Sequence, residues 1–455
     1  MKRPNPILAL MAILTFVVSG LPSSFEVFEA PNQLRERTIK WSTDTIQIAL
    51  SSSLTSSSPA IKPESDVLGA VHRALASWSK AANIKFVEVA SKDQSVSPTS
   101  GGDGVSLITI AGTDENLALF ADENSTARTR VFYDPDTGQI NEADVVINPY
   151  PYSESGAPIQ FSTDGTPGTY DLESTLAHEI GHLLGLTHSH VVGATMQATQ
   201  ALNGTYGEPA ISERTLSEAD LVAIRSLYGR QEKSGSIEGK IQKSVSGNLI
   251  PESAAHVWIE DLTDGRVVAS TVTSGNGKFA FGSVPAGSYR AMVEYLAGPK
   301  ESEAFLEAKS ARVLAFRSVE IRNLLRVTAD KITPLNYVLV PPQDSLPELK
   351  PRFIGLNSEL STVPVSVAAG DKLTLFVGGA GVDQIPGTGL VLSSPFMTVD
   401  PASLMLEQFH RATPVISFTI TVAANAPPGD YTLRLQSNSG ELAYLVGAVT
   451  ISPTQ

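Results

Sequence analysis

The sequence of 455 residues contains no cysteine, which excludes several kinds of chemistry at once. Disulfides, zinc held by thiolates, catalysis by a nucleophilic thiol and a lipidated N-terminal cysteine all require that residue. Stability outside the cytoplasm would therefore come from apolar cores and bound ions. An exported bacterial protein fits this absence better than a small, disulfide-rich secreted protein of animal type.

Positive charge is also scarce, because 33 lysine and arginine residues stand against 47 aspartate and glutamate residues, for a formal net charge of −14. Affinity for nucleic acid rests largely on basic side chains that displace counterions from phosphates, so nucleic acid is not expected as a partner. The rest of the composition, 42% hydrophobic and 18% charged, is that of a folded protein. Its length predicts about three domains.

Long apolar runs are missing after the N-terminus. Lys2 and Arg3 precede an apolar run over 7–18, and small residues through Gly20 follow it, which is typical of an export signal. The run is too short to span a bilayer comfortably. We expect a signal peptide over 1–20 and a secreted or extracellular protein with no membrane span after signal removal. The periplasm and the cell surface stay open as locations, and an uncleaved N-terminal anchor is the alternative.

The most informative segment of the sequence holds three histidines. His178 and His182 stand four residues apart, so on a helix their imidazoles lie on one face and can bind one ion. Gly185 can take φ > 0 and end that helix, which lets His188 return to the same ion. Three neutral nitrogens leave a fourth position for water, as in catalytic zinc sites. The sequence therefore predicts one catalytic zinc per chain.

The residues around these histidines fit the same geometry. Glu179 follows the first histidine, and a carboxylate beside the water position can act as a general base. Apolar residues, among them Leu176, Ile180 and Leu183, recur on roughly the opposite helix face, which we expect to meet the core. A buried helix whose histidines only satisfy backbone groups is the alternative for a bare H-E-x-x-H, and the added glycine and third histidine weigh against it.

The first domain is expected over 38–229, where helical and strand patterns are mixed. The sequence predicts strands over 39–50, 85–89, 105–111, 131–133 and 141–148. An apolar stripe predicts a helix over 65–82, and a Ser217/Asp220 start signal predicts another that ends at Gly229. Together with the histidine helix, these elements make an α+β domain.

Two all-β domains are expected to follow. Strand patterns alternate with turn signals over 234–340 and again over 348–455, so each stretch predicts a β-sandwich, the second Ig-like in broad class. The proline-rich stretch 341–347 is a linker by composition, and 21–37 is expected to be a leader or short pro-region. The predicted fold class is therefore multidomain, with an α+β domain followed by two all-β sandwich domains.

The histidine segment resembles the active-site segment of the metzincin zinc peptidases and, within them, the matrixins. Further matching pieces are Ala194-Thr195-Met196, the segment 138–148 and the helix ending at Gly229, so that the resemblance covers about residues 35–229. It implies that the first domain is a metzincin catalytic domain. It also implies that the zinc ligands are His178, His182 and His188. Glu179 is then the general base, and Met196 is the structural Met-turn residue.

The same resemblance implies how a substrate is held. The segment 115–121 is similar to the edge strand along which matrixins align an extended peptide, with Leu117, Ala118 and Leu119 at its centre. After Met196 the chain has Gln197-Ala198 where matrixins usually have Tyr-Pro. The pocket for the residue after the cleaved bond is therefore expected to differ.

Other matrixin features have a weaker basis in this sequence. Without cysteine there is no cysteine switch, and His72 and His190 are the only histidines of the region outside the motif, so a second, structural zinc is not expected. Calcium as a further cofactor stays open, because the loops 122–124 and 134–136 suit calcium ligands and plain turns alike.

The function that follows is an exported zinc-dependent endopeptidase that hydrolyses peptide bonds in protein or peptide substrates. Residues 234–340 also resemble carboxypeptidase-regulatory-like or transthyretin-like sandwiches, which act as spacers, adhesins or stabilisers. The β-sandwich domains are therefore candidates to bind cell-surface or extracellular-matrix components. The alternative is a surface or extracellular protein for binding or adhesion, with an inactive metalloprotease-like scaffold. The intact Glu179 argues against this alternative.

Overall fold

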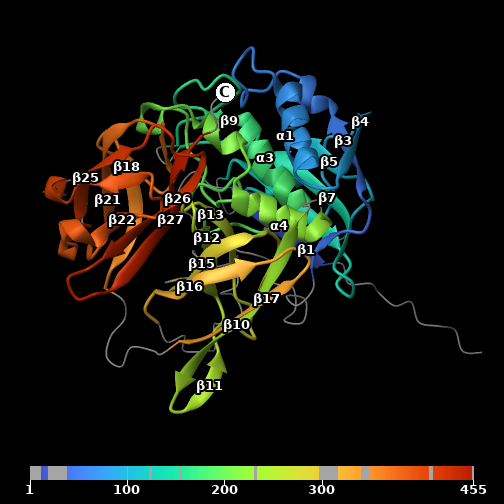
Figure 1. Ribbon diagram of the computed structural model, residues 1–455. Coiled ribbons are helices and arrows are strands. Elements are labelled where there is room, and N and C mark those ends of the chain that lie inside the picture. The colour runs from blue at the N-terminus through green and yellow to red at the C-terminus, as the bar shows by residue number, and fades with distance from the viewer. Residues whose placement is uncertain are drawn as a thin grey trace, which may run out of the picture.

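A computed structural model describes residues 12–18, 38–99, 101–121, 125–153, 156–229, 233–296, 316–339, 348–408 and 413–452. Within these residues the chain forms three lobes in sequence order, which meet near the middle of the molecule (Figure 1). The first lobe mixes helices and strands, and the other two are built from strands. The predicted fold class, an α+β domain followed by two all-β domains, is confirmed.

The N-terminal lobe contains one main sheet with the order β1-β6-β7-β5-β3-β4, and β2 also pairs with β7. Strands β3, β4, β5 and β7 run parallel along this order, whereas β6 runs antiparallel to β7. The bounds are β1 Ala12–Val18, β2 Lys40–Trp41, β3 Thr45–Ser51, η2 Ser52–Thr55, α1 Val67–Ala81, β4 Lys85–Ser91, β5 Leu107–Thr109, α2 Asp114–Ala118, β6 Ala127–Tyr133, β7 Gln139–Ile147, β8 Phe161–Ser162, β9 Tyr170–Asp171, α3 Leu172–Leu183, η3 Thr205–Gly207, η4 Ala210–Arg214 and α4 Glu218–Tyr228.

The long helices begin where the sequence places capping residues. The side chain of Asp66 accepts from Gly69 N at the start of α1, and Asp171 accepts from Ser174 N at the start of α3. Ser217 and the side chain of Asp220 form the predicted capping box of α4. The caps of α1 and α4 confirm the two predicted helix starts to within two residues.

Helices α1 and α3 pack against each other and bury a shared apolar core. Trp78 of α1 is fully buried, and its indole Nε1 donates to Ala177 O of α3 at 2.8 Å. Leu176, Ile180 and Leu183 of α3 are also fully buried in this core. This core fixes the helix that carries the first two histidines.

One predicted strand is wrong. Residues 114–118 form the short helix α2, which begins because the Thr113 side chain accepts from Asn116 N. The amide of Asn116 is fully buried and donates to Gln94 O and Ala111 O, which ties the helix to the preceding loop. The expected substrate strand therefore does not exist at its predicted residues, which lie on α2 and at its C-cap: Leu117, Ala118 and Leu119.

The outer neighbour of β6 is β1, which comes from the predicted export signal. The two strands pair antiparallel, from Ala12 opposite Tyr133 to Val18 opposite Ala127. The rest of 1–37 lies outside the described residues, so signal cleavage and the pro-region stay predictions. In the part of the chain that the structure covers, no helix is long and apolar enough to cross a membrane.

The middle lobe is a sandwich of two sheets. One has the order β11-β10-β14 with β17 parallel to β10, and the other has the order β13-β12-β15-β16. The bounds are β10 Ser234–Val245, β11 Asn248–Pro251, β12 Ala255–Asp261, β13 Val267–Val272, β14 Lys278–Pro285, β15 Gly287–Tyr295, β16 Val319–Val327 and β17 Ile332–Leu339. The predicted linker over 341–347 lies outside the described residues.

The C-terminal lobe is a second sandwich. Its sheets have the orders β19-β18-β21-β25-β23, with β24 on β25, and β20-β27-β26-β22. The bounds are β18 Lys350–Leu356, β19 Glu359–Ser361, β20 Val365–Val367, β21 Lys372–Ala380, η6 Val382–Gln384, η7 Gly387–Gly389, β22 Leu390–Leu392, β23 Met397–Val399, η8 Pro401–Ser403, β24 Met405–Glu407, β25 Val415–Val422, β26 Gly429–Gln436 and β27 Leu442–Ile451.

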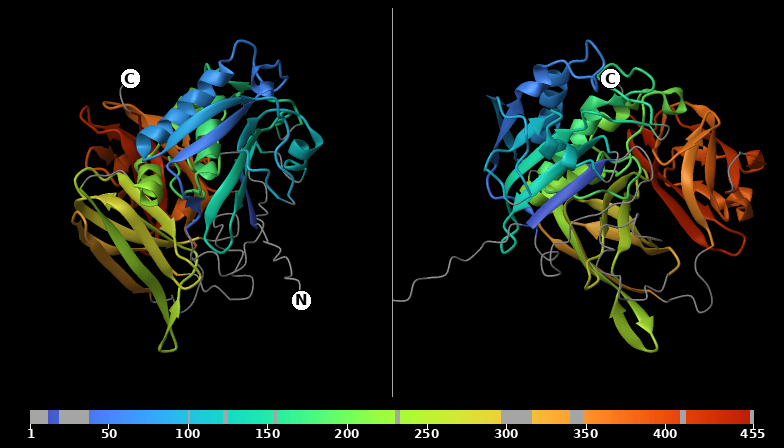
Figure 2. Two further views of the ribbon diagram at one scale, coloured as in Figure 1. Left: turned by 90° about the vertical axis from the view of Figure 1, so that its right-hand side faces the viewer. Right: turned by 180° about the vertical axis from the view of Figure 1, so that it is seen from behind.

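The three lobes lie against one another (Figure 2). Apolar side chains from all three meet beside the loop that follows the histidine helix. One buried cluster draws side chains from all three lobes, namely Val191, Ala194, Ala219, Trp258, Val267, Met292, Tyr444 and Val446. A buried cluster shared in this way favours one fixed arrangement of the lobes over free movement on linkers.

Candidate active site

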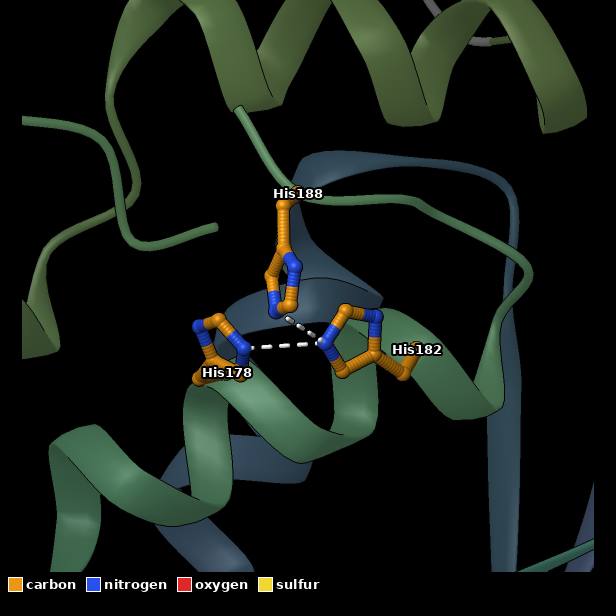
Figure 3. Close-up of side chains that lie close together, drawn as sticks. All are labelled: His178, His182 and His188. Atoms are coloured by element: carbon orange, nitrogen blue, oxygen red, sulfur yellow. Dashed lines mark hydrogen bonds between the residues drawn. The ribbon is translucent and has the colours of Figure 1, made fainter. Parts of the chain in front are cut away.

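The three histidines of the predicted metal site converge (Figure 3). His178 and His182 come from adjacent turns of α3, and His188 comes from the loop beyond it. His182 Nε2 lies 2.9 Å from His178 Nε2 and 3.2 Å from His188 Nε2. Two ligands of one tetrahedral zinc, each at about 2.0–2.1 Å, lie about 3.3–3.4 Å apart, so these separations suit a shared ion.

Gly185 brings the third histidine back to the first two. It follows the last residues of α3 with φ of 93°, and its N donates to His182 O at 2.8 Å. A Cβ at this position would lie 2.3 Å from Ile39 O, a main-chain atom that no side-chain rotation can move. Both the positive φ and the close approach require glycine here, which confirms the predicted role of this residue.

Main-chain carbonyls orient the two helix histidines. His178 Nδ1 lies 2.7 Å from Thr195 O, and His182 Nδ1 lies 2.8 Å from Leu186 O. A carbonyl oxygen can only accept, so each Nδ1 is the protonated donor, and each Nε2 of a neutral ring carries a lone pair. Two lone pairs that face each other at 2.9 Å repel unless a cation lies between them. This donor set therefore fits a divalent metal such as zinc.

Burial keeps the helix histidines in the neutral form that a metal requires. His178 is 3% exposed and His182 is fully buried. Burial lowers the pKa of His178 to about 3 and lowers that of His182 well below its ordinary value, with His188 adding to both effects. Neutral imidazole is the form that binds metal ions.

Glu179 lies on the same helix and is fully buried. Thr129 on β6 donates a hydrogen bond from Oγ1 to Glu179 Oε2, while Glu179 Oε1 has no hydrogen-bond partner among the described residues. Burial raises the pKa of Glu179 to about 8, opposed by the hydrogen bond from Thr129 and the charge of Arg128. A carboxylate with one anchored and one unpartnered oxygen is suited to accept a proton at the second oxygen.

Met196 packs against the histidine helix. Its side chain is 2% exposed, and a Cβ added to Gly181 of α3 would lie 2.2 Å from its Sδ. The turn is held by Asp220, whose side chain accepts from Thr195 N at 2.8 Å and Met196 N at 3.3 Å. Thr195, whose carbonyl oxygen contacts His178, is therefore anchored to the first turn of α4.

Two residues of the site were not predicted from the sequence. Asp220 was assigned only to the cap of α4, and its second role depends on the loop folding back over 25 residues to reach it. Thr129 stands 50 residues before Glu179, and no local pattern marks it. Both act through tertiary contacts, so only the folded chain reveals them.

The described residues give no support for calcium, which the sequence had left open. In the covered part of the chain, the histidine trio is the one group of three or more histidine or acidic residues that could hold a metal ion. Asp134 Oδ1 accepts from Asp136 N and Thr137 N at 2.7 and 3.0 Å, which makes the loop 134–136 a hydrogen-bonded turn. The other candidate calcium loop, 122–124, lies outside the described residues. Nothing in the described residues therefore indicates calcium.

Comparisons with known proteins agree with this geometry. Residues 40–229 match the family model described as matrixin. Metalloendoproteinase 1 from Glycine max is 26% identical over 207 residues, which is 42% of this chain and 53% of that protein. Metalloendoproteinase 4-MMP from Arabidopsis thaliana is 38% identical over 71 residues, which is 16% of this chain and 19% of that protein. The chain thus spans about half or less of the curated relatives that it matches.

Solved structures resemble the chain only distantly. BcpA, the major pilin subunit of Bacillus cereus, is 10% identical, with 49% of this chain and 70% of that chain covered at a TM-score of 0.15. A likeness of this size carries no argument about function. The sequence matches support a zinc metalloprotease kind of function, because residues 40–229 match the matrixin family model.

Proposed function

We propose that the protein is an exported zinc-dependent endopeptidase that hydrolyses peptide bonds in proteins. His178, His182 and His188 would hold the zinc, and Glu179 would be the general base. The observation that carries the proposal is the convergence of three imidazole Nε2 atoms, two of them on rings whose Nδ1 atoms donate to main-chain carbonyls. Lone pairs that face one another in this way repel unless a cation lies between them.

The chemistry divides between the metal and the protein. Zinc, when bound, supplies a Lewis acid that lowers the pKa of water toward about 7 and polarises the carbonyl of the scissile bond. Glu179 takes a proton from the attacking water at Oε1, the oxygen without a partner, and returns it to the leaving amine. Thr129 holds Oε2 so that Oε1 keeps one direction.

The edge of β6 would hold the substrate, in place of the segment 115–121. Thr129 on this strand contacts Glu179, so a peptide paired with β6 would pass beside the proposed base. In the structure β1 already pairs antiparallel with this edge, which supports its capacity to accept an extended segment. Removal of the export signal would leave the edge to peptide substrates.

Three measurements on the purified full chain test the proposal. We expect about one zinc per chain by atomic absorption, cleavage of unfolded casein, and loss of cleavage with a chelator that added zinc reverses. Glu179→Ala should keep the zinc and the thermal unfolding temperature while cleavage falls by at least about a hundredfold, the lower end of what a general base contributes. The matched control is Glu208→Gln, an exposed carboxylate elsewhere in the same domain, which should keep full activity.

The alternative of a binding protein with an inactive scaffold is separated by the same experiment. Zinc-loaded wild type that cleaves no member of a broad peptide library would contradict the peptidase proposal. Ligands on the cell surface or in an extracellular matrix would then be the first to test against the two sandwiches.

A further inference from the structure

The loop 189–194 follows the third histidine and leads into the Met-turn. His188 immediately precedes this loop (Figure 3). Thr195 immediately follows it, and the Thr195 carbonyl oxygen lies 2.7 Å from His178 Nδ1. A shift of the loop would therefore displace one proposed zinc ligand and the carbonyl that orients another.

The middle sandwich meets this loop through His256 of β12. The centre of the His190 ring lies 5.3 Å from the centre of the His256 ring, at an interplanar angle of 51°. The next residue of the loop, Val191, is fully buried in a cluster with Trp258 and Met292 of the same sandwich. The loop thus packs on the face of the sheet that bears these side chains.

Three neighbours fix the ring of His256, which is fully buried. Its Nδ1 lies 2.7 Å from Glu294 Oε1 on β15, and its Nε2 lies 2.8 Å from Ser270 Oγ on β13. The indole of Trp258 stacks on the ring at 4.9 Å between ring centres. A fully satisfied polar network specifies one arrangement of a core, which apolar contacts alone do not. The ring therefore keeps one orientation toward His190.

The C-terminal sandwich meets the next two residues of the loop. Val192 N donates to Val446 O of β27 at 2.8 Å. A Cβ added to Gly193 would lie 2.2 Å from Asp430 Oδ1 and 2.6 Å from Thr450 Oγ1. Thr450 Oγ1 donates to Asp430 Oδ1 at 2.8 Å, which fixes the carboxylate. The main chain of the loop therefore lies directly against an ordered part of this sandwich.

The chain beyond the Met-turn is also anchored in the C-terminal sandwich. Tyr206 is 4% exposed and packs in the core of that sandwich. Its hydroxyl donates to Ile354 O at 2.9 Å and Val363 O at 3.1 Å. The stretch between the third histidine and α4 is therefore held by the last domain at two separate places.

We propose that the two sandwiches position the zinc site through the loop 189–194, with His256 and Asp430 as positioning residues. His256 fixes the segment that follows His188, and Asp430 fixes the segment that precedes Thr195. Both act through the loop, and neither belongs to the proposed metal ligands. The inference rests on the proposed zinc site and adds that all three lobes are needed to shape it.

Zinc competition with a chelating dye on the purified full chain tests His256. His256→Ala removes the ring on which His190 packs and should raise the zinc dissociation constant by at least about tenfold, as loss of an outer partner of a metal ligand does. The control is Tyr289→Phe, which removes the hydrogen bond from the buried Tyr289 hydroxyl to Pro285 O inside the same sandwich. The control should lower the unfolding temperature and keep the wild-type zinc affinity.

A double-mutant cycle separates positioning from a general loosening of the fold. His190→Ala should weaken zinc binding as His256→Ala does, whereas His190→Phe, which keeps a ring, should keep the dissociation constant within about threefold of wild type. With His190→Ala in place, the added His256→Ala change should alter it by less than about twofold. Fully additive effects would overturn the role of His256. Because His190 is only partly buried, its two variants still decide if His256→Ala does not fold.

Gly193→Ala tests the contact with the C-terminal sandwich. Asp430 is 5% exposed and hydrogen-bonded, so the added methyl group should displace the loop and not the carboxylate. The zinc dissociation constant should rise by at least about tenfold, and the visible absorption bands of bound Co²⁺, which report ligand geometry, should shift. Gly387→Ala is the control, because its Cβ would lie 2.1 Å from Pro401 O, a contact internal to that sandwich. The control should cost stability alone.

These measurements do not depend on cleavage, so they separate this inference from the proposed function. Wild type that binds zinc and cleaves nothing contradicts the peptidase function, while zinc affinity and the Co²⁺ spectrum still decide on the positioning. Wild type that cleaves, with His256→Ala and Gly193→Ala losing stability but keeping zinc affinity and the Co²⁺ spectrum, overturns the positioning alone. Wild type that binds no zinc overturns both.

Discussion

Replacing Gly185 by alanine should weaken both the fold and the metal site. Gly185 has φ of 93°, and an added Cβ would lie 2.3 Å from Ile39 O. Gly168 is the matched control, because it has φ of 79° and an added Cβ there would meet nothing within 4 Å. Gly168→Ala thus measures the cost of the positive φ alone, and Gly185→Ala measures that cost together with the overlap.

The two costs can be estimated separately. A left-handed conformation costs an alanine about 1–2 kcal/mol. Overlap with a main-chain oxygen forces a backbone shift that costs about 1–3 kcal/mol more, as in overpacked cores. Gly168→Ala should therefore lower the unfolding temperature by about 4 °C and Gly185→Ala by about 10 °C, at about 2–4 °C per kcal/mol for a domain of this size.

Calorimetry and zinc competition measure the two effects. The unfolding temperature is compared for the wild type and both variants with and without zinc. Because Gly185 positions His188, Gly185→Ala should also raise the zinc dissociation constant by at least about tenfold in competition with a chelating dye. A Gly185→Ala protein no less stable than Gly168→Ala, with wild-type zinc affinity, would refute the reasoning.

Three further changes give expected outcomes. Thr129→Val removes the hydrogen bond that favours ionised Glu179, so the Glu179 pKa should rise and the acidic limb of kcat/KM should move to higher pH by about one unit; an unmoved limb would exclude this role. Tyr206→Phe removes the hydroxyl that donates to the carbonyls of Ile354 and Val363 and should lower the free energy of unfolding in urea by about 1–3 kcal/mol; an unchanged free energy would contradict a stabilising role of this hydroxyl. Asp220→Ala should release the Met-turn and raise protease sensitivity near Met196, whereas a wild-type digestion pattern would argue against this anchor.

Local patterns predicted the parts of the fold that depend on neighbours in sequence. The α1 stripe, the Ser217/Asp220 cap and the glycine after the histidine helix each follow from helix period or backbone freedom, and each appears in the structure. The three histidines converge for the same reason. A spacing of four residues places His178 and His182 on one helix face, and the left-handed turn at Gly185 returns His188 to them.

Tertiary contacts account for what the sequence did not predict. The segment 115–121 was expected to be a strand by family resemblance, yet Thr113 caps a helix there and Asn116 is tied to the preceding loop. Thr129 and Asp220 reach their partners only when strands, loops and helices come together. The periodicity of the sequence carries no information about such long-range contacts.

The place of Tyr206 has a consequence for the order in which the protein is completed. Its hydroxyl partners, Ile354 and Val363, lie 148 and 157 residues later in the chain. Domains generally fold in the order of synthesis, so α3 and its first two histidines can be in place while the C-terminal sandwich is still being made. The loop between the third histidine and α4 reaches its final form only when that sandwich has folded around Tyr206. The loop that follows the third histidine is therefore completed last, by the final domain of the chain.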